Sequence, residues 1–245
     1  ARLHAGDIGA IRLLRVYWNS SGVWVNPRLE SQSEMEYQMR NWYYFNWLCG
    51  DHIVEQHIHN IDVANWVMRG YPVSAQGQGG RQVRTGKEYG EIYDHHFVEF
   101  TYADGTKVLS QCRHIPNCSE SVSEHAHGAT GTAEISRGRI LGPDGKEWRY
   151  RGEPIDPYQV EHDVLFAAIR QDLAHNEAEN GAKTTMSAIL GRMATYSGRV
   201  VGWDEALASE LALVPDVYDW DADPPTLPDE DGFYAIPMPG SSRAL

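Results

Sequence analysis

Residues 95–114, HHFVEFTYADGTKVLSQCRH, decide the fold class, because they read as two alternating β-strands joined by a turn. The turn signal is Asp104-Gly105, a dipeptide suited to a two-residue hairpin loop with positive φ. Such a loop would place Phe100 opposite Leu109 and His96 opposite Arg113. The stretch therefore predicts an antiparallel β-hairpin.

Further strand-like runs lie on both sides of the hairpin. Residues 11–19, IRLLRVYWN, are rich in β-branched and aromatic side chains. The other runs cover residues 72–84, 121–127, 130–136 and 146–151. Such a succession of strands predicts one large, mostly antiparallel open sheet.

Segments with helical spacing bracket the strands, at residues 51–69, 157–174 and 178–201. The first ends at Gly70 with Pro72 just beyond, and Asp156-Pro157 supplies an N-cap and a first-turn residue for the second. The aromatic stretch at 31–49 has no clean period, so we expect a helix that runs into a loop. Strands bracketed by helices predict an α+β domain with helices packed on one face of the sheet.

The C-terminal segment differs in composition from the rest of the chain. From Pro215 onwards, Pro, Asp and Gly dominate. We therefore expect one α+β domain over residues 1–214. Residues 215–245 should form an extended tail that either wraps this domain or contacts a neighbour.

The charge and the hydropathy of the chain argue against two classes of partner. Lys+Arg 21 against Asp+Glu 34 gives a formal charge of -13, which opposes binding to nucleic acid. The sequence contains no apolar run long enough to indicate a membrane protein. The three cysteines form no CxxC pair and are odd in number, so neither a disulfide framework nor a thiolate metal site is indicated.

Polar side chains crowd onto one side of the helix predicted at 51–69. At about 100° per residue, an arc of about 80° contains His52, Glu55, His59, Asp62 and Trp66. The apolar residues on the other side are Val54, Ile58, Ile61 and Met68. A carboxylate at Glu55 can hydrogen-bond an imidazole at His59, fixing its tautomer and raising its basicity. Such a base could take a proton from a sugar hydroxyl.

The same pattern allows two other interpretations. A polar helix face is commonly a solvated surface, although Trp66 lies on this face and a tryptophan prefers to be covered by other residues. His52, Glu55 and His59 could in principle converge on Zn²⁺. Their spacing is neither HExxH nor HxxEH, and His52 and His59 lie roughly 10.5 Å apart along the axis. The sequence therefore favours a catalytic or solvated face over a metal site.

Other residues could complete a pocket for a polyhydroxylated ligand, where aromatic faces stack on sugar C–H groups and imidazoles bond hydroxyls. The open end of the hairpin gathers four polar residues, His95, His96, Arg113 and His114. SEHAHG places His125 and His127 on one face of a strand. The aromatic candidates are Trp42, Tyr43, Tyr44 and Trp47. Each residue alone is more typical of a surface or core edge than of a ligand site.

At this point the sequence resembles a known family. GDHIVEQHIHNIDVANWV, residues 50–67, is similar to the signature helix of the C-terminal domain in the Gfo/Idh/MocA oxidoreductases, the glucose-fructose oxidoreductase and inositol dehydrogenase family. RNWYYFNW, GGRQVRTGKEYGEIYDHHFVEF, SEHAHGATGTAEI and AENGAKTTMSAILGRMATYSGRVV resemble one bacterial branch of it. The resemblance implies a large sheet that binds substrate on one face and often mediates oligomerisation.

The resemblance also implies roles for individual residues. His59 matches the catalytic histidine of the family, Asp62 matches the acid that follows it, and Glu55 replaces an aspartate four residues before it. Because glutamate is longer than aspartate, the carboxylate of Glu55 should lie in a different place from the one in the family. The residue pattern, and not the resemblance, gives the other residues expected to bind substrate besides Asp62, which are His52, Trp42, Tyr44, Trp47, Arg113, His125 and His127.

One part of the family pattern is missing from this chain. Family members carry an N-terminal Rossmann domain with a GxGxxG loop and a Glu-Lys-Pro motif, and neither occurs here. GQGGRQ at 77–82 follows no βα turn and is not a fingerprint. We therefore expect NAD or NADP to be bound mainly by a missing or separate Rossmann domain, and the chain to be part of a longer protein.

The leading hypothesis is the substrate-binding and catalytic portion of an NAD(P)-dependent oxidoreductase acting on a sugar or polyol, in a homo-oligomer assembled through the sheet. One alternative is a dinucleotide-free lyase, epimerase or hydrolase that uses Glu55 and His59. Such an enzyme could recruit a metal through His52, His57, His125 or His127. Another is a non-catalytic sugar-binding or oligomerising module.

Overall fold

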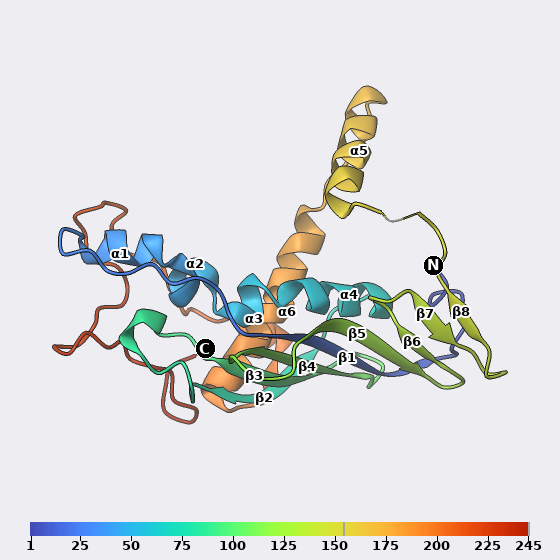
Figure 1. Ribbon diagram of the computed structural model, residues 1–245, viewed down its shortest axis with the longest axis horizontal. Coiled ribbons are helices and arrows are strands. Elements are labelled where there is room, and N and C mark those ends of the chain that lie inside the picture. Colours follow the sequence, from blue (N-terminus) through green and yellow to red (C-terminus); the bar gives the residue numbers. More distant parts are fainter. Residues whose placement is uncertain (154, 245) are drawn as a thin grey trace.

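Residues 1–153 and 155–244 are described by a computed structural model, in which nine strands form one open sheet covered by helices on a single face (Figure 1). The strand order is β8-β7-β6-β5-β1-β4-β3-β2-β9. Neighbouring strands are antiparallel except for β1 and β4, which pair in parallel. The α+β fold class and the mostly antiparallel sheet are confirmed.

The strands are β1 Ile11–Ser20, β2 Ser74–Gly80, β3 His95–Thr101, β4 Lys107–His114, β5 Ser121–Gly128, β6 Thr132–Glu134, β7 Arg139–Leu141, β8 Glu147–Arg149 and β9 Val201–Gly202. The helices are α1 Glu34–Arg40, η1 Trp42–Tyr44, α2 Asn46–Cys49, α3 His52–Glu55, α4 Ile58–Met68, η2 Lys87–Tyr89, α5 Pro157–Arg170, α6 Ala178–Ser197 and α7 Trp203–Leu207. In the part of the chain that the structure describes, no helix is long and apolar enough to span a bilayer.

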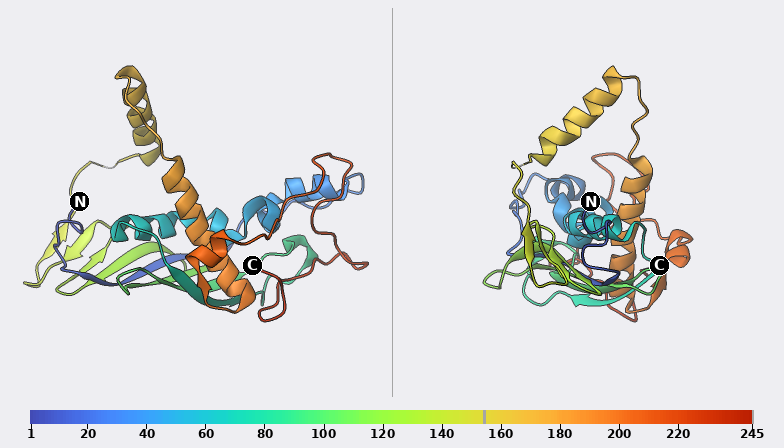
Figure 2. Two further views of the ribbon diagram at one scale, coloured as in Figure 1. Left: turned by 180° about the vertical axis from the view of Figure 1, so that it is seen from behind. Right: turned by 90° about the vertical axis from the view of Figure 1, so that its right-hand side faces the viewer.

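Alternation along the strands gives the sheet one apolar and one polar face. Leu14 and Val16 of β1 and Val108 of β4 are buried beneath the helices, whereas their neighbours in sequence are partly exposed. Helix α4 packs on β1 and β5, and α6 packs on β2 and β3. Two further views show the opposite face of the sheet uncovered (Figure 2).

The predicted hairpin forms between β3 and β4, but its predicted register is wrong by one residue. Phe100 lies opposite Val108 and not Leu109, and His96 lies opposite Cys112 and not Arg113. Because side chains alternate between faces, this shift decides which polar groups meet the helices. Both His96 and Cys112 lie on the helix-covered face.

The cause of the shift is a three-residue loop where a two-residue loop was expected. The Tyr102 N–H donates to the Thr106 carbonyl and the Gly105 N–H donates to the Tyr102 carbonyl, both at 2.9 Å. Gly105 has a φ of 83°, the left-handed conformation that such a bulged turn requires. The Asp104 carboxylate accepts from the Thr106 N–H at 2.9 Å and fixes the loop.

The single helix predicted at 51–69 is interrupted. Helix α3 ends at Glu55, and α4 begins at Ile58 after a turn in which the His57 N–H donates to the His52 carbonyl. The end of α4 was predicted correctly: Arg69 adopts a left-handed φ of 55°, and the Gly70 N–H returns to the Asn65 carbonyl. The interruption changes which side chains share a face.

Most of the other predicted elements are confirmed. Strands β2, β5, β6 and β8 overlap the predicted runs, and α5 begins with the Asp156 side chain accepting from the Tyr158 N–H. Residues 31–49 contain α1, the short η1 and α2. Strands β7 and β9 lie outside the predicted strand runs.

The C-terminal tail wraps the domain. It runs beside α1 and α2 (Figure 1), where the buried Tyr234 ring lies 4.9 Å from the ring of Phe45. The Ser33 hydroxyl donates to the Trp220 carbonyl at 3.1 Å, and the Gln38 amide donates to the Thr226 carbonyl at 2.7 Å. These contacts attach the tail to the lobe formed by α1, η1 and α2.

Candidate functional site

Helix α4 corresponds to the second half of the helix predicted at 51–69, and it carries the outward polar face that the sequence predicts there. His59 and Trp66 are exposed, Trp66 at 59%, and the partly exposed Asp62 lies between them. Helical spacing of three and four residues keeps these side chains on one face. The Asp62 carboxylate accepts from the Thr184 hydroxyl of α6 at 2.7 Å, so this acid also ties the two helices together.

Two buried side chains beside His59 hold the first turn of α4 on the sheet. His57 Nε2 lies 2.8 Å from Ser110 Oγ of β4, and the Asn60 amide donates to the Glu124 carboxylate of β5. Burial lowers the pKa of His57 to about 3, so its ring is neutral. Because β4 and β5 flank β1, His59 is fixed above the central strand.

Trp18 and Glu55 are the candidate neighbours of His59. The Trp18 ring of β1 lies 6.0 Å from the imidazole. Glu55 ends α3; partial burial raises its pKa, while the Tyr43 hydroxyl and the charge of His59 oppose that rise. Among the hydrogen bonds of the described residues, none joins Glu55 to His59. The direct bond expected for a continuous helix is therefore missing, because the turn before α4 interrupts it.

His52 does not share the outward face, and its predicted place on the front of the helix is wrong. Its side chain is fully buried on the opposite side. Asp51 takes a positive φ of 73°, which turns the chain inward at the start of α3. The Asp51 carboxylate accepts from His52 Nδ1 at 2.7 Å, from the Tyr93 N–H at 2.9 Å and from the Tyr196 hydroxyl.

The buried histidines around Asp51 form one stacked cluster. His114 stacks on His52, with ring centroids 4.4 Å apart, and bonds the Gln56 side chain through Nε2 at 3.0 Å. Burial lowers the pKa of His52, but Cys112 and the Asp51 carboxylate outweigh it and raise that pKa to about 10. Burial lowers the pKa of His114 to about 2. The cluster thus pairs one cation, His52, with one anion, Asp51.

The same cluster contains the group of side chains best placed to approach a metal. Ligand atoms of Asp51, His52 and His96 lie within 4.8 Å of one another. However, His52 Nδ1 and His96 Nε2 lie only 2.7 and 3.2 Å from oxygens of Asp51. That carboxylate already accepts from several other donors. The geometry fits a hydrogen-bonded network, in which the carboxylate lone pairs are in use.

Three predicted ligand residues lie on the uncovered face of the sheet. His127 accepts from Arg15 Nε at 3.0 Å, His125 packs edge-on against Tyr17, and Arg113 donates to the Ser119 carbonyl at 2.6 Å. The sheet separates them from His59, so the expectation of one shared pocket is wrong. The alternation of β4 and β5 causes this placement, since Ser110 and Glu124 occupy the helix-covered face.

The predicted aromatic wall is mostly the core of the α1–α2 lobe. Tyr44 is fully buried and donates to the Trp24 carbonyl at 2.9 Å, so it cannot contact a ligand on α4. Trp42 packs on Trp24 with ring centroids 5.7 Å apart. The indole of the half-buried Trp47 donates to Gln38 at 2.7 Å.

The sequence reasoning missed Trp18, Asn60 and Glu124. The signal for Trp18 was present, because the alternation that buries Leu14 and Val16 also places position 18 under the helices. Asn60 and Glu124 could not be found this way. Their contact depends on where α4 crosses the sheet.

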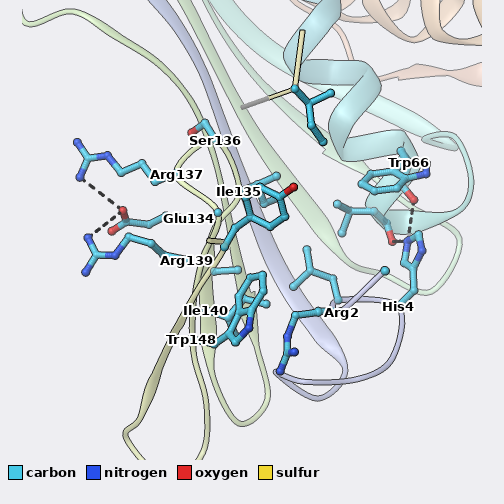
Figure 3. A pocket seen from close by; sticks show the side chains of 17 residues that line it. Arg2, His4, Trp66, Glu134, Ile135, Ser136, Arg137, Arg139, Ile140 and Trp148 are labelled. Atoms are coloured by element: carbon cyan, nitrogen blue, oxygen red, sulfur yellow. Dashed lines mark hydrogen bonds and ion pairs between the residues drawn. The ribbon is translucent and has the colours of Figure 1, made fainter. Parts of the chain in front are cut away.

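A cavity of about 860 Å³ lies at the other end of α4 (Figure 3). Its wall is mainly apolar and includes Ile135, Ile140, Trp148 and the exposed Trp66. Arg137 and Arg139 pair with Glu134 at one side, away from this wall. Trp66, which lines this cavity, also belongs to the outward face of α4 that carries His59.

Comparison with known families gives one match over more than half of the chain. Residues 1–144 match the GFO/IDH/MocA C-terminal domain. No curated protein matches the chain.

Solved structures with the same fold are distant in sequence. Aldose-aldose oxidoreductase from Caulobacter crescentus shares 16% identity at a TM-score of 0.64, over 82% of this chain and 58% of that one. Levoglucosan dehydrogenase in complex with NADH shares 12% at 0.62, over 82% and 60%. UDP-N-acetylglucosamine 3-dehydrogenase from Acidithiobacillus ferrooxidans shares 14% at 0.56, over 79% and 56%. The chain thus spans less than two thirds of the length of these structures.

Proposed function

Because this chain belongs to the GFO/IDH/MocA family of oxidoreductases, we propose that it is the substrate-binding and catalytic portion of an NAD(P)-dependent enzyme acting on a sugar or polyol hydroxyl. The observation that carries the proposal is the outward-facing His59, fixed above the central strand with Glu55 and Trp18 beside it. The sugar and polyol chemistry of the solved relatives supports the substrate class.

In this proposal His59 takes the proton from the substrate hydroxyl. A general base must lie within hydrogen-bond reach of that proton, and an exposed imidazole on a rigid helix meets this need. The Glu55 carboxylate favours the imidazolium that forms, because the two charges attract. Trp18 supplies an aromatic surface against which a sugar ring can pack.

The residues present do not fit a dinucleotide. Residues 77–82 lie at the end of β2 and lead into a loop, whereas a dinucleotide fingerprint connects a strand to a helix N-terminus. We therefore assign the hydride acceptor, NAD or NADP, to a Rossmann domain outside this chain.

Two exposed apolar surfaces on the helix side support such a partner domain. Helix α5 stands away from the sheet (Figure 1), with Tyr158, Leu165 and Ile169 exposed at 75, 41 and 63%. A 14-residue helix is marginal in water unless its apolar side is covered. The cavity beside Trp66 offers a second apolar surface.

The uncovered face of the sheet is the proposed site of homo-oligomerisation. It exposes Phe97 at 40% together with the polar side chains of Arg15, Tyr17, His125 and His127. A mixed aromatic and polar surface on a flat sheet is typical of a protein interface.

The test is an assay of the natural gene product, made from its complete reading frame. We expect NAD(P)-dependent oxidation of a polyol or aldose, with kcat reduced by about 10²–10⁴ in His59→Asn. Glu55→Gln should also lower kcat, while the control His175→Asn, an exposed histidine, should not. Turnover without nicotinamide would instead support a lyase, epimerase or hydrolase, and equal rates in His59→Asn would refute the assigned base.

A further inference from the structure

A second cavity, of about 280 Å³, lies away from α4, between the α1–α2 lobe, α6 and the C-terminal tail. On the side away from the tail, its polar lining comes from Asn46, Glu91, Arg192 and Tyr196. Residues 211–213 and the tail close the other side, the tail with Pro225, Thr226, Pro237 and residues 242–244. Neither His59 nor Glu55 reaches this space, so it is a separate site.

The buried Arg192 and the half-buried Glu91 line this cavity without touching each other, and the exposed Arg243 of the tail is a third charged residue of the lining. Arg192 is only 7% exposed and uses one N–H on the Gly50 carbonyl at 3.3 Å. Glu91 accepts from the Asn46 backbone N–H at 2.8 Å. Among the ion pairs of residues 1–153 and 155–244, none joins Arg192 to Glu91. A buried guanidinium and a carboxyl that share a cavity leave a gap for a group that satisfies both.

Apart from Thr226, Ser242 and Arg243 of the tail, the rest of the lining is apolar. Trp47, Leu211, Leu213 and the two prolines surround the charged groups. The volume corresponds to about nine water molecules, which suits a compact molecule of roughly ten heavy atoms. An apolar wall with one buried guanidinium, that of Arg192, and one carboxyl favours a ligand with two charged ends and a short hydrocarbon part.

We propose that this cavity binds a small zwitterion of α-amino-acid type, with its carboxylate on Arg192 and its ammonium group on Glu91. The planar guanidinium matches a carboxylate through two parallel N–H donors. The Glu91 carboxylate offers lone pairs to an ammonium group. The short side chain of the ligand lies against Trp47 and the tail, so binding also fastens the tail onto the lobe.

Binding of the zwitterion should change the protonation of Glu91. Burial raises the pKa of Glu91 to about 7, so the carboxyl is partly protonated near neutral pH. A bound ammonium group favours the ionised carboxylate. Binding at or below pH 7 therefore releases protons to the buffer, whereas binding of a simple anion to Arg192 alone does not.

The experiment is calorimetric titration of the purified protein with L-valine in two buffers of different ionisation enthalpy, at pH 6.5. Two truncated probes are matched to it: 3-methylbutanoate lacks the amine and 2-methylpropylamine lacks the carboxylate. We expect L-valine to bind with proton release, and each truncated probe to bind at least about tenfold more weakly. No binding of L-valine, or equal binding of 3-methylbutanoate, would overturn the proposal.

Variants test the two charged groups. Arg192→Met and Glu91→Gln should each weaken L-valine binding at least about tenfold, and Glu91→Gln should abolish the proton release. Arg192→Lys keeps the charge but loses the two parallel N–H donors, so it should also weaken binding, and it covers the case in which Arg192→Met fails to fold. The controls Arg170→Met and Glu30→Gln, both exposed, and His59→Asn should bind as the parent does. Unchanged binding in Glu91→Gln and Arg192→Lys would place the ligand elsewhere, and loss in His59→Asn would place it at the α4 site.

Discussion

Nε2 of His57, the residue that precedes α4, lies 2.8 Å from Ser110 Oγ of β4, and this buried contact joins the candidate catalytic helix to the sheet. The contact matters because α4 has no side-chain cap at its first residue. With the Asn60 amide on Glu124, it fixes the turn from which His59 projects. The orientation of an exposed residue therefore depends on neighbours that no ligand touches.

Ser110→Ala should lower stability and disturb the site together. The substitution leaves a buried imidazole nitrogen without its partner, which costs about 1–3 kcal/mol in the free energy of unfolding. Urea unfolding measures that loss. In the complete enzyme kcat should fall more than KM rises, because the base moves while the rest of the pocket stays. Ser110→Thr keeps the hydroxyl and should restore kcat; failure of that rescue would contradict a positioning role.

Stability should fall as the pH rises from about 7 towards 10. The pKa of His52 is raised to about 10 in the folded chain, from about 6.5 when unfolded. Its contribution is therefore complete below pH 6.5 and is lost as the pH passes through the folded value. The free energy of unfolding in urea at pH 6.5 and 9.5 measures this loss. Asp51→Asn removes the partner charge and should flatten the dependence; an equally steep fall in that variant would assign it to another group.

At acid pH, the dependence of stability on pH has the opposite sign. The pKa of Asp51 is held well below its usual value, because His96 and His52 outweigh the effect of burial. Its contribution is present above the unfolded value of about 3.9 and is lost as the pH falls through the folded one. Acid unfolding followed by tryptophan fluorescence should therefore begin at a higher pH in His52→Gln than in the parent chain.

The sequence predicts the fold better than it predicts the site, for physical reasons. Alternation and turn residues are local, so β1, β5 and the hairpin were found, whereas the three-residue loop at Gly105 shifted the register by one. The positive φ of Asp51 and the turn before His57 are set by the buried cluster. Helical periodicity alone could not show that His52 faces inward.

The apolar surface of α5 can be tested by substitution. Ile169 is 63% exposed, so Ile169→Glu should leave the unfolding of this chain within about 0.5 kcal/mol of the parent. In the complete enzyme the same change should lower thermal stability and cofactor affinity, because it places a charge in the proposed domain interface. Asp163→Asn on the same helix is the control. Equal behaviour of Ile169→Glu and parent in the complete enzyme would show that the Rossmann domain does not cover α5.

Two glycines of α6 offer a matched pair for the packing of this helix on the sheet. A Cβ at Gly191 would lie 2.8 Å from Phe100 Cζ and 3.0 Å from Ile53 Cδ1, whereas one at Gly181 meets no atom within 4 Å. Gly191→Ala should therefore destabilise by about 1–3 kcal/mol through overpacking. Gly181→Ala should stabilise by about 0.5–1 kcal/mol, because alanine loses less backbone entropy in a helix. Urea unfolding of both variants against the parent measures the two signs. Gain of stability in both would mean that α6 packs less closely on β3 than the structure shows, since the helix propensity of alanine would then act unopposed at both positions.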